Sequence, residues 1–187
     1  MKISDRKTIQ SFGDEWTRFN QKNIDNSELM KIFNSYFEIF PWHKIKKNSN
    51  GFDAGCGSGR WAKFVAPRVK VLNCIEPSKA IDVAKKNLSN FNNINFYNST
   101  IQDLKIKSAS QDFGYVLGVL HHISDTESAL KSCVRVLKKG SPLLIYMYYN
   151  FENKPIWFKA IWKLSDYIRK FIAISPKPIK YLLSSLI

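Results

Sequence analysis

The chain has 187 residues, which suits one domain with a hydrophobic core, and its 44% hydrophobic and 24% charged residues exclude wholesale disorder. Its formal net charge of +14 favours anionic partners, such as nucleic acid, acidic lipid headgroups or phosphorylated metabolites. The basic residues form no concentrated block, so we interpret most of this charge as a background bias of composition and keep nucleic acid as the less favoured partner.

Cysteine and histidine usage argues against a disulfide framework and against a zinc site. The three cysteines are widely spaced, and the three histidines complete no metal-binding pattern. Residues 1–6 lack the apolar run of a signal peptide, and no stretch approaches the roughly 18 apolar residues of a membrane-spanning helix. We therefore expect a cytoplasmic protein with reduced thiols and no metal site.

Residues 1–47 are predicted to form an N-terminal helical cap or lid. Ser27 is the predicted N-cap of a helix whose apolar residues recur at helical spacing as far as Phe40. Pro41 is predicted to end this helix, because proline removes a backbone donor and disfavours helix at the preceding residue.

Residues 48–150 alternate between short apolar runs and amphipathic segments, which predicts strands alternating with helices. We expect strands at 48–54, 69–75, 94–97, 113–120 and 143–149. Intervening helices are expected at 61–66, from Ser78 to about Leu88, and from a Ser124–Glu127 capping box to Gly140. This order predicts an α/β, Rossmann-like, doubly wound and mostly parallel sheet with helices on both faces, whose ligand lies at the carboxyl ends of the strands.

Residues 151–187 are predicted to form a C-terminal helical segment, which is rich in aromatic and basic side chains. A helix is predicted at 155–173, and Pro176 and Pro178 follow it. Such a segment can act as a lid, make peripheral contact with a membrane surface, or contact RNA.

The glycine loop at residues 53–59 has the sequence Asp-Ala-Gly-Cys-Gly-Ser-Gly and follows the first strand, where a nucleotide-type cofactor would lie. The dinucleotide fingerprint fails here, because Arg60 stands where its third glycine is required. Asp53 suits a ligand with a cationic end better than it suits a pyrophosphate. Glu76, at the end of the second strand and about 20 residues later, is where a ribose diol is held in Rossmann-type sites.

These motifs resemble the class I S-adenosylmethionine-dependent methyltransferases, and within them the type 11 methyltransferase domain family. The resemblance covers roughly residues 50–149 and includes the glycine loop, the acidic residue at 76, the segment 110–123 and the turn at 137–140. It departs from the family pattern at Thr100, where an acidic residue is usual. The resemblance implies S-adenosyl-L-methionine as cofactor, bound by Asp53, Ala54, Gly55, Gly57, Gly59, Glu76, Pro77, Thr100, Ile101, Gln102, Gly118, Trp16 and Arg18.

The resemblance also implies transfer of a methyl group to an acceptor, and a small molecule such as a sugar, lipid or metabolite is favoured. His121 at the end of the fourth strand is the candidate general base. RNA methylation, cofactor binding without catalysis and NAD-dependent oxidoreduction are the alternatives. The family core ends with an antiparallel hairpin, which the helical pattern of residues 151–187 does not predict, so we interpret the C-terminus as shortened. The oligomeric state is left open.

Overall fold

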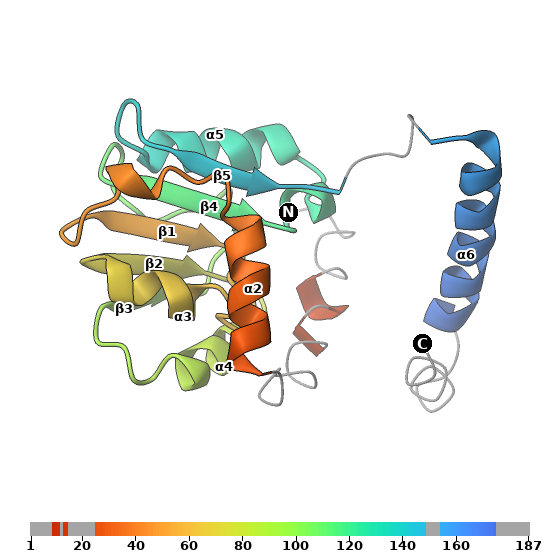
Figure 1. Cartoon of the computed structure of the whole chain (residues 1–187), viewed down its shortest axis with the longest axis horizontal. Coiled ribbons are helices and arrows are strands. Elements are labelled where there is room, and N and C mark those ends of the chain that lie inside the picture. The colour runs from red at the N-terminus through yellow and green to blue at the C-terminus, as the bar shows by residue number, and fades with distance from the viewer. Residues whose placement is uncertain (1–8, 12, 15–24, 149–153, 175–187) are drawn as a thin grey trace. The chain divides into compact units, whose positions relative to one another are not determined.

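The structure is a computed structural model that describes residues 9–11, 13–14, 25–148 and 154–174 (Figure 1). The chain divides into two compact units, residues 1–148 and 149–187. The first unit contains the sheet, and the described part of the second is one helix. The predicted residues Trp16 and Arg18 lie outside the described residues.

Five parallel strands form one sheet in the order β3-β2-β1-β4-β5. The strands are β1 (Asn50–Ala54), β2 (Val71–Ile75), β3 (Ile94–Tyr97), β4 (Phe113–Leu117) and β5 (Leu143–Tyr146). Successive strands build outward from β1 to β3, and the chain then crosses back to place β4 on the other side of β1. The predicted Rossmann-like fold is confirmed, and this reversal puts the expected ligand site at the carboxyl ends of β1 and β4.

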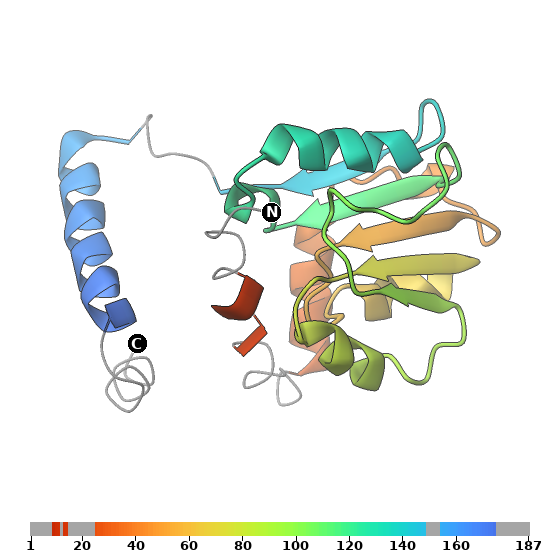
Figure 2. The ribbon, with the colours of Figure 1, turned by 180° about the vertical axis from the view of Figure 1, so that it is seen from behind.

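Helices cover both faces of the sheet, with α2 and α3 on one face and α5 on the other (Figures 1 and 2). The first unit contains α2 (Asn26–Tyr36), η1 (Trp42–Lys44), α3 (Ala62–Val65), η2 (Ala66–Arg68), α4 (Ala80–Asn87), η3 (Leu120–His122) and α5 (Thr126–Val136). One core joins α2, α3 and α4 to the sheet, with Phe33, Val65 and Ile81 all buried. A second core joins α5 to the opposite face through residues such as Cys133 and Phe52.

Several predicted element ends are wrong by one to four residues. Asp25, not Ser27, caps α2, because its carboxylate accepts the N–H of Ser27 at 3.2 Å. Asp125, not Ser124, caps α5 by accepting the N–H of Ser128 at 3.0 Å. The same helix ends at Val136 instead of Gly140, since Leu137 is extended and bridges to Gln111.

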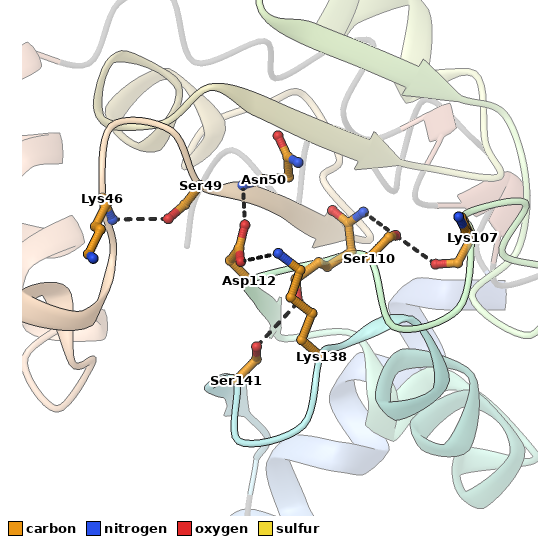
Figure 3. A network of polar contacts seen from close by, with 9 residues as sticks. Lys46, Ser49, Asn50, Lys107, Ser110, Asp112, Lys138 and Ser141 are labelled. Carbon is orange, nitrogen blue, oxygen red and sulfur yellow. Dashed lines mark hydrogen bonds and ion pairs between the residues drawn. The ribbon is translucent and has the colours of Figure 1, made fainter.

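A polar network fastens the amino end of the sheet, away from the predicted ligand edge (Figure 3). The Asp112 carboxylate accepts the Asn50 N–H at 2.8 Å and the Lys138 ammonium at 2.6 Å. Burial alone would raise the pKa of Asp112, but these two donors outweigh it and lower the pKa. The network therefore ties the start of β1 to the turn between α5 and β5.

The described part of the second unit is α6 (Ile156–Ile174), which agrees with the predicted helix. Among the residues described after β5 there is this helix and no strand. No helix in the described parts of the chain combines the length and apolarity needed to cross a membrane. Cys56, Cys74 and Cys133 are all buried and free.

Candidate functional site

The glycine loop leaves the carboxyl end of β1 and is fastened to the end of β2. The backbone N–H groups of Gly55 and Cys56 both donate to the Ile75 carbonyl, at 2.8 and 3.0 Å. Gly55 has a φ of 79°, and a Cβ built on it would lie 2.5 Å from Cγ2 of Val119. Backbone conformation and space therefore both require glycine at this position.

Glu76 holds the same loop through its side chain. One carboxylate oxygen accepts the N–H of Gly57 at 3.0 Å, and the other accepts the N–H of Ser78 at 3.0 Å. The residue is only 8% exposed but lines the cavity described below. Since each carboxylate oxygen can accept more than one hydrogen bond, Glu76 retains acceptor capacity for two ligand hydroxyls.

Asp53 lies behind the loop and is 3% exposed. Burial raises the pKa of its carboxyl to about 8, the Tyr115 hydroxyl opposes this shift, and the charge of Glu76 adds to it. The Tyr115 hydroxyl is thus close enough to affect the titration, but no hydrogen bond of normal geometry joins the two groups within the described residues. A positive charge placed near this buried carboxyl would stabilise its ionised form.

Helix α5 positions the loop that follows β3. Ser132 donates to the Gln102 carbonyl at 3.3 Å, and Arg135 donates to the Leu104 carbonyl at 2.7 Å. Ile101 is buried against the core on this face of the sheet. These contacts hold the backbone of the loop beside the glycine loop.

A cavity of about 440 Å³ opens where these loops meet, at the carboxyl ends of β1, β2 and β4. This volume falls in the range of small-molecule and cofactor sites. Eight of the predicted site residues line it: Gly55, Gly57, Glu76, Pro77, Thr100, Ile101, Gln102 and Gly118. Asp53, Ala54, Gly59 and His121 do not line it.

His121 does not line the cavity, but its neighbour His122 does. The two imidazole centroids are 3.9 Å apart, and the His121 ring also meets the Tyr148 ring edge-on at 4.7 Å. Both ring nitrogens of His121 are buried without a hydrogen-bond partner in the described parts of the chain. Burial lowers the pKa of both histidines, and in His122 the neighbouring His121 lowers the pKa further.

Sequence reasoning missed several residues of the cavity wall. Arg60 and Trp61, directly after the glycine loop, line the cavity, as do Val119 and His122. The guanidinium of Arg60 lies 4.2 Å from the centroid of the Trp61 ring. Arg60 and Trp61 directly follow the predicted glycine loop, and Val119 and His122 lie inside the segment 110–123, so their nearness to the predicted motifs was the available signal.

Residues 52–145 match the model of a family described as a methyltransferase domain. An O-methyltransferase of Pyrenophora dematioidea is 32% identical over 98 residues, covering 50% of this chain and 37% of the relative. A demethylmenaquinone methyltransferase of Staphylococcus haemolyticus is 24% identical over 160 residues, covering 83% of this chain and 64% of the relative. The chain thus spans less than two thirds of the length of these two relatives.

Solved structures show the same fold. Phosphoethanolamine N-methyltransferase 1 of Haemonchus contortus, in complex with phosphoethanolamine and S-adenosylhomocysteine, superposes with a TM-score of 0.57 at 18% identity. The superposition covers 74% of this chain and 31% of that chain. At this identity the likeness concerns the fold alone.

Proposed function

Because the chain belongs to the methyltransferase domain family, we propose that it is an S-adenosylmethionine-dependent methyltransferase acting on a small-molecule acceptor. The observation that carries this proposal is the hydrogen bond from the Gly57 N–H to Glu76, which fixes a carboxylate against the glycine loop in the wall of a cavity of about 440 Å³. The curated relatives support a small-molecule acceptor, because one is an O-methyltransferase and another a demethylmenaquinone methyltransferase.

The residues present fit this cofactor. The positive φ of 79° at Gly55 and 54° at Gly57 lets the backbone approach a ligand without an intervening side chain. Glu76 would hold the ribose hydroxyls, and Ile101 with Thr100 and Gln102 would contact the adenine. Asp53, whose Oδ2 has no hydrogen-bond partner within the described residues, would stabilise the cationic end of the cofactor through the loop.

S-adenosylmethionine, when bound, supplies a methyl group on a sulfonium whose leaving group is a neutral thioether. The protein therefore has to align the acceptor, exclude water and, for a hydroxyl acceptor, take up a proton. We propose His121 for that last role, because both of its ring nitrogens lack a hydrogen-bond partner within the described residues, and burial lowers its pKa, which favours the neutral imidazole. His122 lines the cavity and His121 does not, so the role requires the acceptor to extend beyond the cavity toward the His121 ring.

Calorimetry with S-adenosylhomocysteine and with NAD tests the cofactor assignment. We expect saturable uptake of S-adenosylhomocysteine and none of NAD, since Arg60 occupies the position of the third glycine of the dinucleotide motif. Tight NAD uptake without a response to S-adenosylhomocysteine would overturn the proposal.

Labelled cofactor incubated with fractionated cell extract tests catalysis. Label in a small-molecule fraction is the expected result, while label in RNA would support the alternative acceptor. Cofactor binding without label in any fraction would favour a non-catalytic binding protein.

If the enzyme is active, His121→Ala should reduce turnover much more than it reduces affinity for S-adenosylhomocysteine, and an equal loss of both would contradict the proposed base.

We further propose that α6 makes peripheral contact with an anionic membrane surface from the cytoplasmic side. Six apolar or aromatic side chains that are more than half exposed share one helical face: Ile156, Trp157, Ile161, Leu164, Tyr167 and Ile168. The basic residues Lys159, Lys163, Arg169 and Lys170 occupy the other side, where the ammonium of Lys170 pairs with Asp166 at 2.8 Å. An amphipathic helix of this kind suits the headgroup region of acidic lipids.

A further inference from the structure

Six aromatic side chains beside the cavity form a continuous row of ring contacts, which we call the aromatic arc. In order of contact, the aromatic arc consists of Trp61, Tyr36, Tyr146, Tyr148, His121 and His122. Neighbouring ring centroids are 5.3, 4.7, 5.7, 4.7 and 3.9 Å apart along this order. The first four separations lie within the roughly 4.5–7 Å typical of interacting aromatic pairs, and the rings of the two adjacent histidines are closer.

Both ends of the aromatic arc belong to the cavity wall. Trp61 lines the cavity next to the glycine loop, and His122 lines it at η3. Between these ends, Tyr146 closes β5 and Tyr148 follows it, and the two are 38% and 65% exposed. The aromatic arc therefore extends the cavity wall from the cofactor loop to the carboxyl ends of β4 and β5, and presents accessible rings there.

The chemistry of the aromatic arc is that of ring faces and phenolic hydroxyls next to a cation. Burial, followed by the neighbouring phenols of Tyr146 and Tyr148, raises the pKa of Tyr36, so its hydroxyl remains protonated at neutral pH. The Arg60 guanidinium lies over the Trp61 ring at one end of the row. These groups can stack on a ring and exchange hydrogen bonds with a hydroxyl, and the guanidinium favours an electron-rich ligand.

We propose that the aromatic arc is the acceptor-binding surface and that it selects a planar aromatic alcohol, such as a phenol or a naphthol, over a sugar or an aliphatic alcohol. This inference rests on the proposed function, because an acceptor is needed only beside a methyl donor. A flat ring can lie against Tyr146 and Tyr148, while its hydroxyl points toward the histidine end of the row. Two aromatic contacts predict a preference of about tenfold or more over a saturated ring of the same size.

The test compares 2-naphthol with its saturated analogue decahydro-2-naphthol, each titrated into the full chain by calorimetry with and without saturating S-adenosylhomocysteine. We expect 2-naphthol to bind at least about tenfold more tightly. Tyr148→Leu and Tyr146→Leu should each remove most of this preference while leaving affinity for S-adenosylhomocysteine within about twofold. Both tyrosines are partly exposed, so neither substitution should prevent folding. The matched control is Tyr167→Leu in α6, a tyrosine that is 71% exposed and not part of the aromatic arc.

Failure of this inference can be distinguished from failure of the proposed function. Equal affinity for the two alcohols, or an unchanged preference in both Tyr→Leu variants, would overturn the aromatic arc as the acceptor site even if S-adenosylhomocysteine binds. Tight binding of a sugar or an aliphatic alcohol in place of 2-naphthol would do the same. Failure to bind S-adenosylhomocysteine would instead overturn the proposed function.

Discussion

At the scale of single residues, Glu76 joins the structure of the loop to the proposed binding of the cofactor. Glu76→Gln replaces one acceptor oxygen with a donor that faces a backbone N–H of Gly57 or Ser78. Hydrogen bonds to a charged group contribute about 1.5–3 kcal/mol, so affinity for S-adenosylhomocysteine should fall roughly tenfold to a hundredfold. Calorimetry measures this loss.

The control for this substitution is Glu127→Gln on the surface of α5, where the carboxylate pairs with Lys131 and its side chain is 78% exposed. This variant should bind as the original chain does, because an exposed ion pair contributes little. Equal affinities in all three proteins would refute the role of Glu76.

The buried carboxyl of Asp53 should make stability depend on pH. Folding raises its pKa from 3.8 to about 8, so between these values the folded state holds a proton that the unfolded state has released. The free energy of unfolding therefore falls as pH rises through this window, by up to about 1.4 kcal/mol per pH unit from this one group. Asp53→Asn should remove that slope, and should gain in melting temperature relative to the original chain as pH rises.

Thermal unfolding of both proteins between about pH 5 and about pH 8 checks this expectation. Asp82→Asn serves as the control, because the Asp82 side chain is 75% exposed and its charge remains hydrated when the chain folds. Parallel curves for the original chain and Asp53→Asn would contradict the buried titration.

At the scale of elements, the glycine loop and the segment after β4 constrain each other. Gly55→Ala would place a Cβ 2.5 Å from Val119 in a residue with a φ of 79°, whereas Gly140→Ala has the same φ and nothing within 4 Å. The left-handed conformation alone costs about 1–2 kcal/mol, and the steric clash should add roughly 1–3 kcal/mol at residue 55 only. Urea denaturation measures the difference between the two variants.

Removing the clash provides the companion test. In a Val119→Ala background, Gly55→Ala should destabilise the protein less than it does alone, because the two side chains then no longer overlap. Strict additivity of the two substitutions would show that backbone conformation explains the whole effect.

The order of the elements could be predicted from the sequence because their signals are local. A buried parallel strand is a short apolar run, and the glycine loop carries its own backbone requirement, so β1, β2 and their connection follow from residues 50–76 alone. Helix caps were harder, because Asp125 stands beside Ser124 and both have suitable side chains. Which of the two residues caps α5 depends on the turn before the helix. In that turn the Thr126 hydroxyl lies within hydrogen-bond distance of the Leu120 and Ile123 carbonyls, at 3.2 and 3.0 Å.

The cavity wall shows why the rest of the site could not be predicted. The fourth strand was expected to continue to Leu120, but it ends at Leu117, and Gly118 then turns the chain with a φ of 73° into η3. That early turn brings His122, and not His121, into the wall. Contacts such as that between Tyr36 and Tyr146 join segments far apart in the chain, so no local pattern indicates them.

At the scale of the whole molecule, α6 differs from the rest of the described chain in how much apolar surface it exposes. Ile156 is 85% exposed and Trp157 is 64% exposed, whereas the large apolar side chains of the first unit are mostly buried in its two cores. Exposure of these apolar side chains to water is unfavourable, and burial of the adjacent lysine ammonium groups against a purely apolar partner is also unfavourable. An anionic bilayer surface satisfies both, since the apolar side chains enter the acyl boundary and the ammonium groups meet lipid phosphates.

The full chain should therefore sediment with vesicles of phosphatidylglycerol and much less with vesicles of phosphatidylcholine, and added salt should weaken the binding. Trp157→Ser combined with Ile161→Ser should reduce binding at least tenfold, because each buried apolar side chain contributes about 1.5–3 kcal/mol. Val134→Ser on α5 is the matched control, since Val134 is 56% exposed on the first unit. Equal binding to both lipids, or no loss in the double variant, would contradict membrane contact. Binding to RNA that weakens steeply with salt and is unaffected by the double variant would instead assign the basic side of α6 to nucleic acid.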